Sequence, residues 1–264
     1  MGDQMPWLPL VLLPAFPFDG RMWDRVRAGL ADHVEMVTPD PRGFGRPVGA
    51  AEPDVGVLAR DVLDLLDERG LDRVLLGGCS MGGYVSMAVL RAAPERVAGL
   101  LLVDTKPTAD PQQAKENRFA MAERAERDGL AGWFAEDMLP VLLGAASLES
   151  RPDVVETVRR LTGAVEPGSV AWAQRAMAAR PDSCGALRAA DIPALVLHGE
   201  QDALIPLESA RATAELLPQG ELVVLPDTGH LPPLEAPAEV GMAITEWLER
   251  NHELLRSSAG RNRA

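Results

Sequence analysis

One serine stands in a cluster of small residues between two apolar runs, in the segment LLGGCSMGGYVSM at residues 75–87. Gly78, Ser80 and Gly82 match the pattern Gly-x-Ser-x-Gly, which presents a serine on a sharp turn between a strand and a helix. Small neighbours permit the strained backbone angles and the close approach of segments that such a turn needs. The pattern therefore indicates a nucleophilic serine at Ser80.

Glycine-rich turns also bind phosphate, but the spacing here does not fit the two common motifs. A phosphate loop starting at Gly77 needs a lysine where the chain has Gly83 and a hydroxyl where it has Tyr84. A dinucleotide fingerprint that starts at Gly77 needs a second glycine two residues later, where the chain has Cys79. A serine that is small only for packing is the remaining alternative to a nucleophile.

A serine hydroxyl is a poor nucleophile until a base accepts its proton, and the chain has four histidines. His230 lies in LPDTGHLPPLE, a loop that its prolines and Gly229 keep from forming a helix, after the last predicted strand. His198 ends a strand, where a structural role is favoured, and His33 and His252 fit surface positions. An ordinary imidazole pKa of about 6.5 suits a base at neutral pH. His230 is the predicted base.

The base needs a carboxylate to hold it in the correct tautomer. Asp202 follows the strand predicted at 194–198, and Asp104 directly follows the strand predicted at 98–103. Both strand ends face the site, so Asp104 is a rival, and a turn or capping role is open for either aspartate. We favour Asp202, which gives the chain order Ser80, Asp202, His230.

Short apolar runs bounded by turn residues predict buried strands. They span residues 8–14, 34–37, 73–78, 98–103, 194–198 and 221–226. Amphipathic stretches between them, such as residues 54–70, predict helices. The expected fold class is therefore α/β, a mostly parallel open sheet of about six strands flanked by helices.

The alternation of strand and helix breaks between residues 107 and 184. Helical patterns follow one another there at 112–127, 130–143, 153–161 and 169–179, with prolines expected at their ends. This segment predicts a helical cap inserted at 107–184 into a core made of 1–106 and 185–255. Residues 256–264 have no apolar anchor and predict a flexible tail.

Composition limits the partners. A formal net charge of −13 disfavours nucleic acid and anionic membrane surfaces, and no stretch is long and apolar enough to span a bilayer. The two cysteines suggest neither zinc spacing nor a disulfide framework, and Asp3 without nearby basic residues argues against a secretion signal. We expect a cytoplasmic protein with a small-molecule substrate and no metal or cofactor, its oligomeric state left open.

Four motifs in order along the chain resemble the α/β-hydrolase superfamily. They are PDPRGFGRP (39–47), GCSMGG, HGEQD and TGHLPPLEAP, and the resemblance covers nearly the whole chain. It is nearest to small capped serine esterases and 3-oxoadipate enol-lactonases. It implies a Ser-His-Asp hydrolase with an acyl or lactone pocket shaped by the cap. Only a few residues precede the strand at Leu8, so the family's opening hairpin is missing and a smaller sheet is expected.

The resemblance also implies an oxyanion hole of two backbone N–H groups. Met81, at the helix start, supplies one and Phe16 the other, while Pro17 has no N–H to give. Family members commonly carry His-Gly where this chain has Pro14 and Ala15. The Phe16 N–H survives that change, although Ala15 leaves less room for substrate. One such donor stabilises the transition state by about 3 kcal/mol.

The expected pocket residues lie on the cap and are Trp133, Phe134, Met138 and Trp172. They predict a mostly apolar pocket for a small or medium carboxylic ester or lactone, although an apolar helix face is by default packed core. The triad also fits thioesterase, carbon–carbon bond hydrolase and cofactor-free haloperoxidase or perhydrolase chemistry. A ligand-binding member without catalysis is a further alternative.

Overall fold

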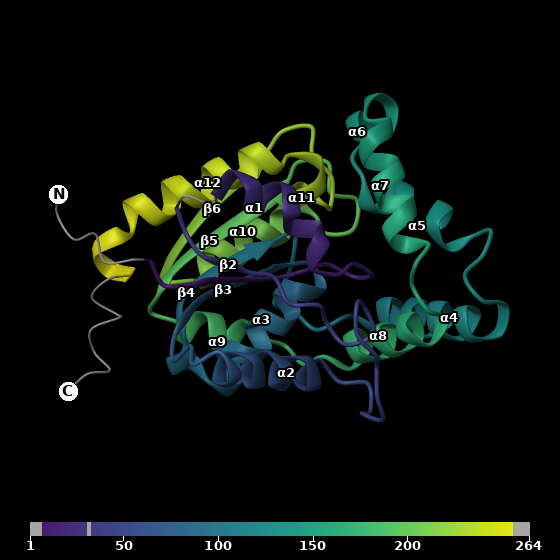
Figure 1. Ribbon diagram of the computed structural model, residues 1–264, viewed down its shortest axis with the longest axis horizontal. Helices are drawn as coiled ribbons and strands as arrows, with labels where there is room; N and C mark the ends of the chain where they lie inside the picture. The colour runs from purple at the N-terminus through teal and green to yellow at the C-terminus, as the bar shows by residue number, and fades with distance from the viewer. Residues whose placement is uncertain (1–6, 31–32, 256–264) are drawn as a thin grey trace.

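The computed structural model describes residues 7–30 and 33–255. Within them, six strands form one sheet in the order β2-β1-β3-β4-β5-β6, and every neighbouring pair is parallel (Figure 1). The strands are β1 (Leu10–Leu13), β2 (Met36–Val37), β3 (Val74–Cys79), β4 (Val97–Val103), β5 (Pro193–Gly199) and β6 (Gln219–Leu225). The predicted fold class is confirmed.

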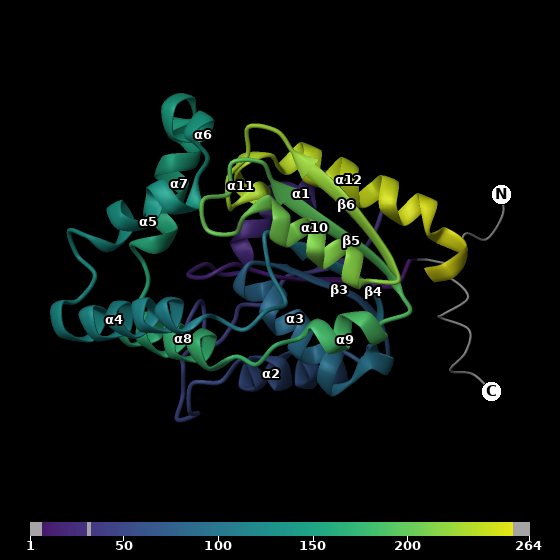
Figure 2. The same ribbon diagram turned by 180° about the vertical axis from the view of Figure 1, so that it is seen from behind.

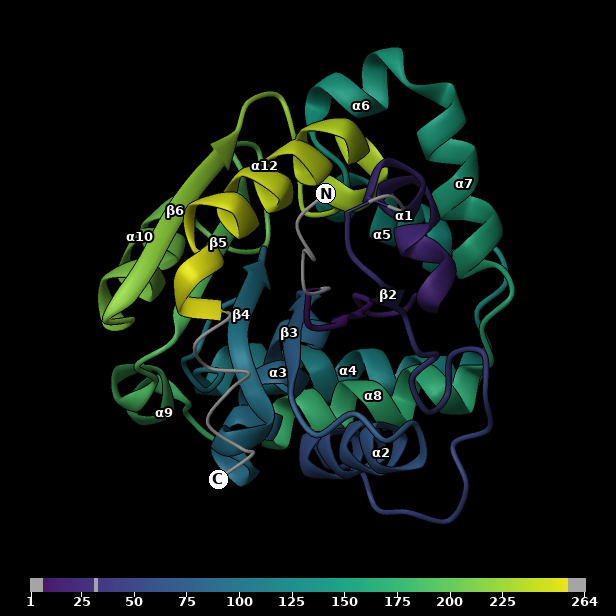
Figure 3. The ribbon, with the colours of Figure 1, turned by 60° about the vertical axis from the view of Figure 1, so that its left-hand side comes forward.

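Helices cover both faces of the sheet, which explains why the inner strands are continuously apolar. All residues of β1, β3, β4 and β5 are buried, whereas the edge strand β6 is mostly half-exposed. Figure 3 shows α1 and α12 on one side of the sheet and α2 and α3 on the other. The core helices are α1 (Asp24–Leu30), α2 (Val55–Glu68), α3 (Met81–Ala92), α9 (Cys184–Ala189), α10 (Leu207–Leu216), α11 (Pro232–Glu235) and α12 (Pro237–Arg250).

Helix α2 illustrates how local sequence sets the helix ends. The Asp54 side chain accepts a hydrogen bond of 2.8 Å from the N–H of Gly56 and caps the first turn. Gly70, with a positive φ of 64°, follows the last turn and lets the chain leave the helix. The amphipathic stretch predicted at 54–70 is therefore this helix, with its buried face on the core.

The described segment 107–184 holds five helices before α9, one more than the sequence predicts. They are α4 (Gln112–Asp128), α5 (Phe134–Leu142), α6 (Ala145–Ser150), α7 (Pro152–Thr162) and α8 (Pro167–Ala179). We call α4–α8 the cap helices. Figure 2 shows α4 and α8 lying along each other, with α5, α6 and α7 in a second group.

The prolines of the cap helices mark helix ends with one exception. Pro152 and Pro167 begin α7 and α8, and Pro111 caps α4, whereas Pro140 lies inside α5. No helix in the described part of the chain has the length and apolarity that crossing a bilayer takes. The tail predicted at 256–264 lies outside the described residues.

Candidate active site

Ser80 stands on a strained turn between β3 and α3. Its backbone has φ 51° and ψ −110°, a conformation that residues other than glycine rarely adopt. A Cβ on Gly78 would lie 2.4 Å from the carbonyl carbon of Gly82, and a Cβ on Gly82 would lie 2.3 Å from the Leu13 carbonyl oxygen. The close approach of three backbone segments therefore requires both glycines of the motif.

The turn is fixed by the neighbouring strand β4. The N–H of Ser80 donates to the Val103 carbonyl at 2.8 Å, and the Thr105 hydroxyl donates to the Ser80 carbonyl at 2.9 Å. A Cβ on Gly83 would meet the Thr105 side chain at 2.5 Å, so the helix start and this loop are in direct contact. Ser80 is thereby presented at the carboxyl end of the sheet.

His230 lies in the loop after β6 and its side chain is 2% exposed. Its Nδ1 lies 2.8 Å from Oδ2 of Asp202, within hydrogen-bond distance. The His230 N–H donates to the Leu142 carbonyl at the end of α5, and the Cys79 thiol donates to the His230 carbonyl at 3.6 Å. The loop is therefore tied both to a cap helix and to the residue beside Ser80.

Ser80 and His230 line the same cavity. Among the hydrogen bonds of the described residues, none joins the Ser80 hydroxyl to the imidazole. Such bonds are often long or poorly aligned in unliganded enzymes and tighten when substrate binds. The arrangement leaves Nε2 of His230 as the nitrogen available to the serine, because Nδ1 faces Asp202.

The side chain of Asp202 is buried and makes three contacts. Its Oδ1 accepts hydrogen bonds from the N–H groups of Leu204 (2.8 Å) and Ile205 (3.1 Å), and its Oδ2 faces His230. Burial alone acts to raise the pKa of Asp202, but the charge and hydrogen bond of His230 lower it overall. Asp202 is therefore ionised at neutral pH, as an acid that orients a histidine must be.

Asp104, the rival acid, occupies a different position. Its Oδ1 accepts from the Gly199 N–H at 3.0 Å and lies 3.2 Å from Nδ1 of the buried His198. Single side-chain atoms of Asp104, Asp202 and His230 all lie within 4.8 Å of one another. Burial, followed by the charge of Asp202, raises the pKa of Asp104 well above its usual range. Burial thus favours the protonated form of Asp104, and the hydrogen bond to His230 belongs to Asp202.

One predicted oxyanion donor, Met81, directly follows Ser80, and the other, Phe16, lines the same cavity as the serine. Met81 is the first residue of α3, where a helix leaves its N–H without an internal partner. Phe16 lines the cavity, and no hydrogen bond found within the described residues uses its N–H. The turn that contains Phe16 is held by hydrogen bonds from the Phe18 N–H to the Ala15 carbonyl (2.8 Å) and from the Ala15 N–H to the Met22 sulfur (3.3 Å).

The cavity has a volume of about 470 Å³ and lies between the sheet and the cap helices. One part of its wall is apolar and the other polar. The apolar part includes Phe16, Met121, Met138, Val141, Leu142, Met177, Leu204 and Ile205, and the polar part includes Tyr84, Lys106, Asp110, Asn117, Arg118, Asp137 and Gln174. The pocket is therefore less apolar than the sequence predicts.

Of the four predicted pocket residues, Met138 lines this cavity. Phe134 is buried against the ring of Phe16, with 6.2 Å between centroids. Trp133 donates its indole N–H to Gly129 and lies under Arg124, and Trp172 donates to the Ala51 carbonyl. These three aromatic side chains pack the cap helices, because an apolar helix face does not reveal whether it meets a cavity or a neighbour.

Comparison with known proteins agrees with this geometry. A family model described as alpha/beta hydrolase fold matches residues 9–237. The chain belongs to the α/β-hydrolase fold family. The resemblance stated from the four motifs is thus confirmed.

The structure of this α/β-hydrolase superposes on solved enzymes. A thermophilic esterase from Thermogutta terrifontis, solved with malate bound, is 42% identical with a TM-score of 0.89, covering 94% of this chain and 91% of that one. The enol-lactonase from Burkholderia xenovorans has a TM-score of 0.83 over 94% of each chain. At 24% identity it supports the fold alone.

One curated relative is the dihydrolipoyllysine-residue acetyltransferase component of the acetoin cleaving system of Pseudomonas putida. It is 31% identical over 92% of this chain, which spans 64% of the relative's length. The chain thus matches one portion of that longer protein.

Proposed function

We propose that this α/β-hydrolase is a serine hydrolase that cleaves carboxylic esters or lactones of small molecules through an acyl-enzyme. The observation that carries the proposal is the 2.8 Å contact between Asp202 and the imidazole of His230, beside a cavity that His230 shares with Ser80. A buried, ionised carboxylate behind an imidazole, next to a serine on a strained turn, is the arrangement that nucleophilic acyl transfer needs.

In the first half-reaction, Nε2 of His230 accepts the proton of Ser80 as its Oγ attacks the carbonyl carbon of the substrate. The N–H groups of Phe16 and Met81 stabilise the resulting oxyanion. As the tetrahedral intermediate collapses, His230 returns the proton to the departing alcohol oxygen, and Asp202 stays ionised throughout. For a lactone the alcohol remains attached to the acyl chain.

In the second half-reaction, water attacks the acyl-enzyme carbonyl while His230 accepts one of its protons. The intermediate collapses to a carboxylic acid, and the proton passes back to Ser80. Thioester, carbon–carbon bond and perhydrolase chemistry use the same three groups, so the triad alone does not separate them. The 42% identical relative that is an esterase favours ester hydrolysis.

Ser80→Ala tests the proposal. A panel of p-nitrophenyl esters of rising chain length and a set of lactones should reveal hydrolysis by the unmodified protein. Ser80→Ala should lower kcat by about a millionfold, because removal of the nucleophile disables the triad as a unit.

Ser150→Ala is the matched control, because Ser150 is exposed on α6 and its hydroxyl bonds, among the described residues, only the Ala146 carbonyl. It should keep the full rate. A loss of only a few-fold in folded Ser80→Ala would place the chemistry elsewhere.

A further inference from the structure

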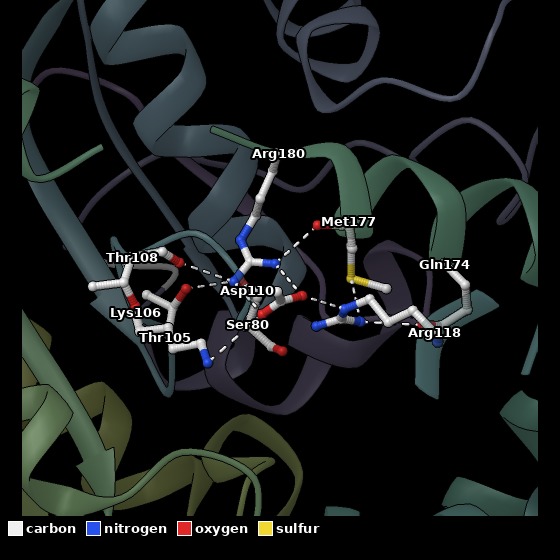
Figure 4. A network of polar contacts seen from close by, with 9 residues as sticks. All are labelled: Ser80, Thr105, Lys106, Thr108, Asp110, Arg118, Gln174, Met177 and Arg180. Atoms are coloured by element: carbon white, nitrogen blue, oxygen red, sulfur yellow. Dashed lines mark hydrogen bonds and ion pairs between the residues drawn. The ribbon is translucent and has the colours of Figure 1, made fainter. Parts of the chain in front are cut away.

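One carboxylate in the cavity wall is surrounded by three cationic side chains (Figure 4). Arg180 makes two hydrogen bonds to Asp110, Nη1 to Oδ2 at 2.7 Å and Nη2 to Oδ1 at 2.8 Å. Arg118 donates from Nε to Oδ2 at 2.6 Å, and Nζ of Lys106 lies 3.7 Å from Oδ1. The side chains of Asp110 and Arg180 are 1% and 4% exposed. We call these four residues the Asp110 cluster.

The Asp110 cluster carries more positive than negative charge. The other acid in the lining of the cavity, as far as the described residues go, is Asp137, which is paired with Arg124 at 2.8 Å. Burial lowers the pKa of Lys106, and the two arginines lower it further, while Asp110 acts in the opposite direction without overcoming them. Three cations around one anion give this wall a net positive charge, which a second negative group could neutralise.

Both Nη groups of Arg180 are used within the protein. Besides Asp110 they bond the carbonyls of Met177 and Thr108, and its guanidinium lies 3.9 Å from the ring centroid of Tyr84. Arg180 therefore serves to hold Asp110 and the end of α8 in place.

Arg118 and Lys106 differ from Arg180 because both line the cavity. Nη1 of Arg118 bonds Gln174 at 3.1 Å, while its Nη2 makes no hydrogen bond with any described residue. The ammonium of Lys106 has only the 3.7 Å contact with Asp110 in the described part of the chain. The side chain of Arg118 is 21% exposed and that of Lys106 is 23% exposed. Their unused N–H groups are available to a ligand in the cavity.

The position of Lys106 links this charge to the nucleophile. Lys106 directly follows Thr105, whose hydroxyl bonds the Ser80 carbonyl at 2.9 Å. Figure 4 draws Ser80 together with Lys106 and Asp110, and all three residues line the cavity. The loop that fixes the nucleophile therefore also fixes a cation in the same cavity.

We propose that Lys106 and Arg118 form a subsite for a carboxylate on the acyl part of the substrate, which makes the preferred substrates half-esters of dicarboxylic acids. The proposal rests on the proposed function. The free carboxylate takes charge-assisted hydrogen bonds from Arg118 and Lys106, and the ester carbonyl is delivered to Ser80. The apolar wall accommodates the methylenes between the two groups.

The test compares monomethyl esters of succinate, glutarate and adipate with methyl esters of monocarboxylic acids of equal chain length. The unmodified protein should prefer the best half-ester over its neutral counterpart by at least tenfold in kcat/KM, as expected for a charged hydrogen bond. Arg118→Gln and Lys106→Gln should each lower that preference at least tenfold, and sodium chloride should reduce it in the unmodified protein.

Arg175→Gln is the matched control. Arg175 also joins α4 and α8 through an ion pair, with Glu126 at 2.6 Å, but it does not line the cavity. It should leave the preference unchanged. Because Arg118 also bonds Asp110, Lys106→Gln gives a second variant that breaks no short contact. No preference in the unmodified protein, or an equal preference in all three variants, would overturn the proposal.

Binding to Ser80→Ala separates this proposal from the proposed function. Titration calorimetry with monomethyl glutarate measures the subsite without turnover. Binding that weakens at least tenfold when Lys106→Gln is added supports the subsite even if no ester is cleaved. Binding that is unaffected by Lys106→Gln contradicts the subsite even if esters are cleaved.

Discussion

The two sides of the cavity are positioned by different kinds of contact. On the sheet side, Ser80 is fixed by backbone segments that approach so closely that only glycine fits at Gly78 and Gly82. On the cap side, Met138 and Arg118 are positioned by side-chain packing and ion pairs on α5 and α4. We therefore expect the sheet side to tolerate little change and to control the rate of the proposed hydrolysis. We expect the cap side to tolerate more change and to select the acyl group.

After the loss expected for Ser80→Ala, the largest expected effect is on the sheet side, at the acid. Asp202→Asn should lower kcat/KM by about 10⁴-fold, because the imidazole loses the carboxylate that fixes its tautomer. Asp104→Asn should cost less than tenfold, since burial already favours the protonated form of Asp104 and the imidazole is hydrogen-bonded to Asp202 instead. Steady-state rates on one ester compare the two. Equal losses would mean that the two aspartates share the role of the acid.

The next effect is on stability and concerns the cap side. Asp110→Asn should lower the free energy of unfolding at pH 7 by about 3 kcal/mol or more, because it leaves Arg180 buried without its carboxylate. Glu126→Gln removes an exposed ion pair between α4 and α8 and should cost less than about 1 kcal/mol. Urea unfolding measures both, and equal costs would remove the distinction between the buried and the exposed pair.

The same substitution has a pH signature. Burial acts to raise the pKa of Asp110, but the hydrogen bonds and charges of Arg180 and Arg118 hold it well below its usual range. A carboxylate whose pKa is lowered in the folded state stabilises the fold at pH values above its unfolded pKa of about 4. This stabilisation is lost as the pH falls below that value. The stability difference between the unmodified protein and Asp110→Asn should therefore be constant from pH 7 to about pH 5 and shrink below about pH 4. A difference that grows on acidification would contradict the assigned charge state.

The smallest expected effect concerns acyl-chain selection on the cap side. Met138→Ala enlarges the cavity on its apolar side and should shift the preference toward longer acyl chains several-fold. Trp133→Phe, five residues before it and outside the lining, should leave the preference as it is. Ratios of kcat/KM across an ester series measure the shift. A larger effect of Trp133 would mean that the cap helices rearrange around substrate.

The contrast between the two sides also explains what sequence reasoning could reach. Ser80, Asp202 and His230 each follow a strand with a strong apolar signal, and parallel strands bring such ends to one edge. The sheet was predictable for the same reason. Arg118 gave no such signal, because α4 has few apolar residues and only its packing on α8 decides which charges face the cavity. Helix α6 was missed because its six residues lack an apolar period.

Covalent labelling with a fluorophosphonate is the most direct test of whether His230 activates Ser80 as a nucleophile. The probe reacts with a serine only when a neighbouring base activates it, so mass spectrometry of the intact protein and its peptides reports the triad without any assumption about substrate. The account predicts one adduct on Ser80, no adduct in Ser80→Ala, and labelling at least a thousandfold slower in His230→Ala. A folded protein that is not labelled, or a His230→Ala variant labelled at the unmodified rate, would contradict it.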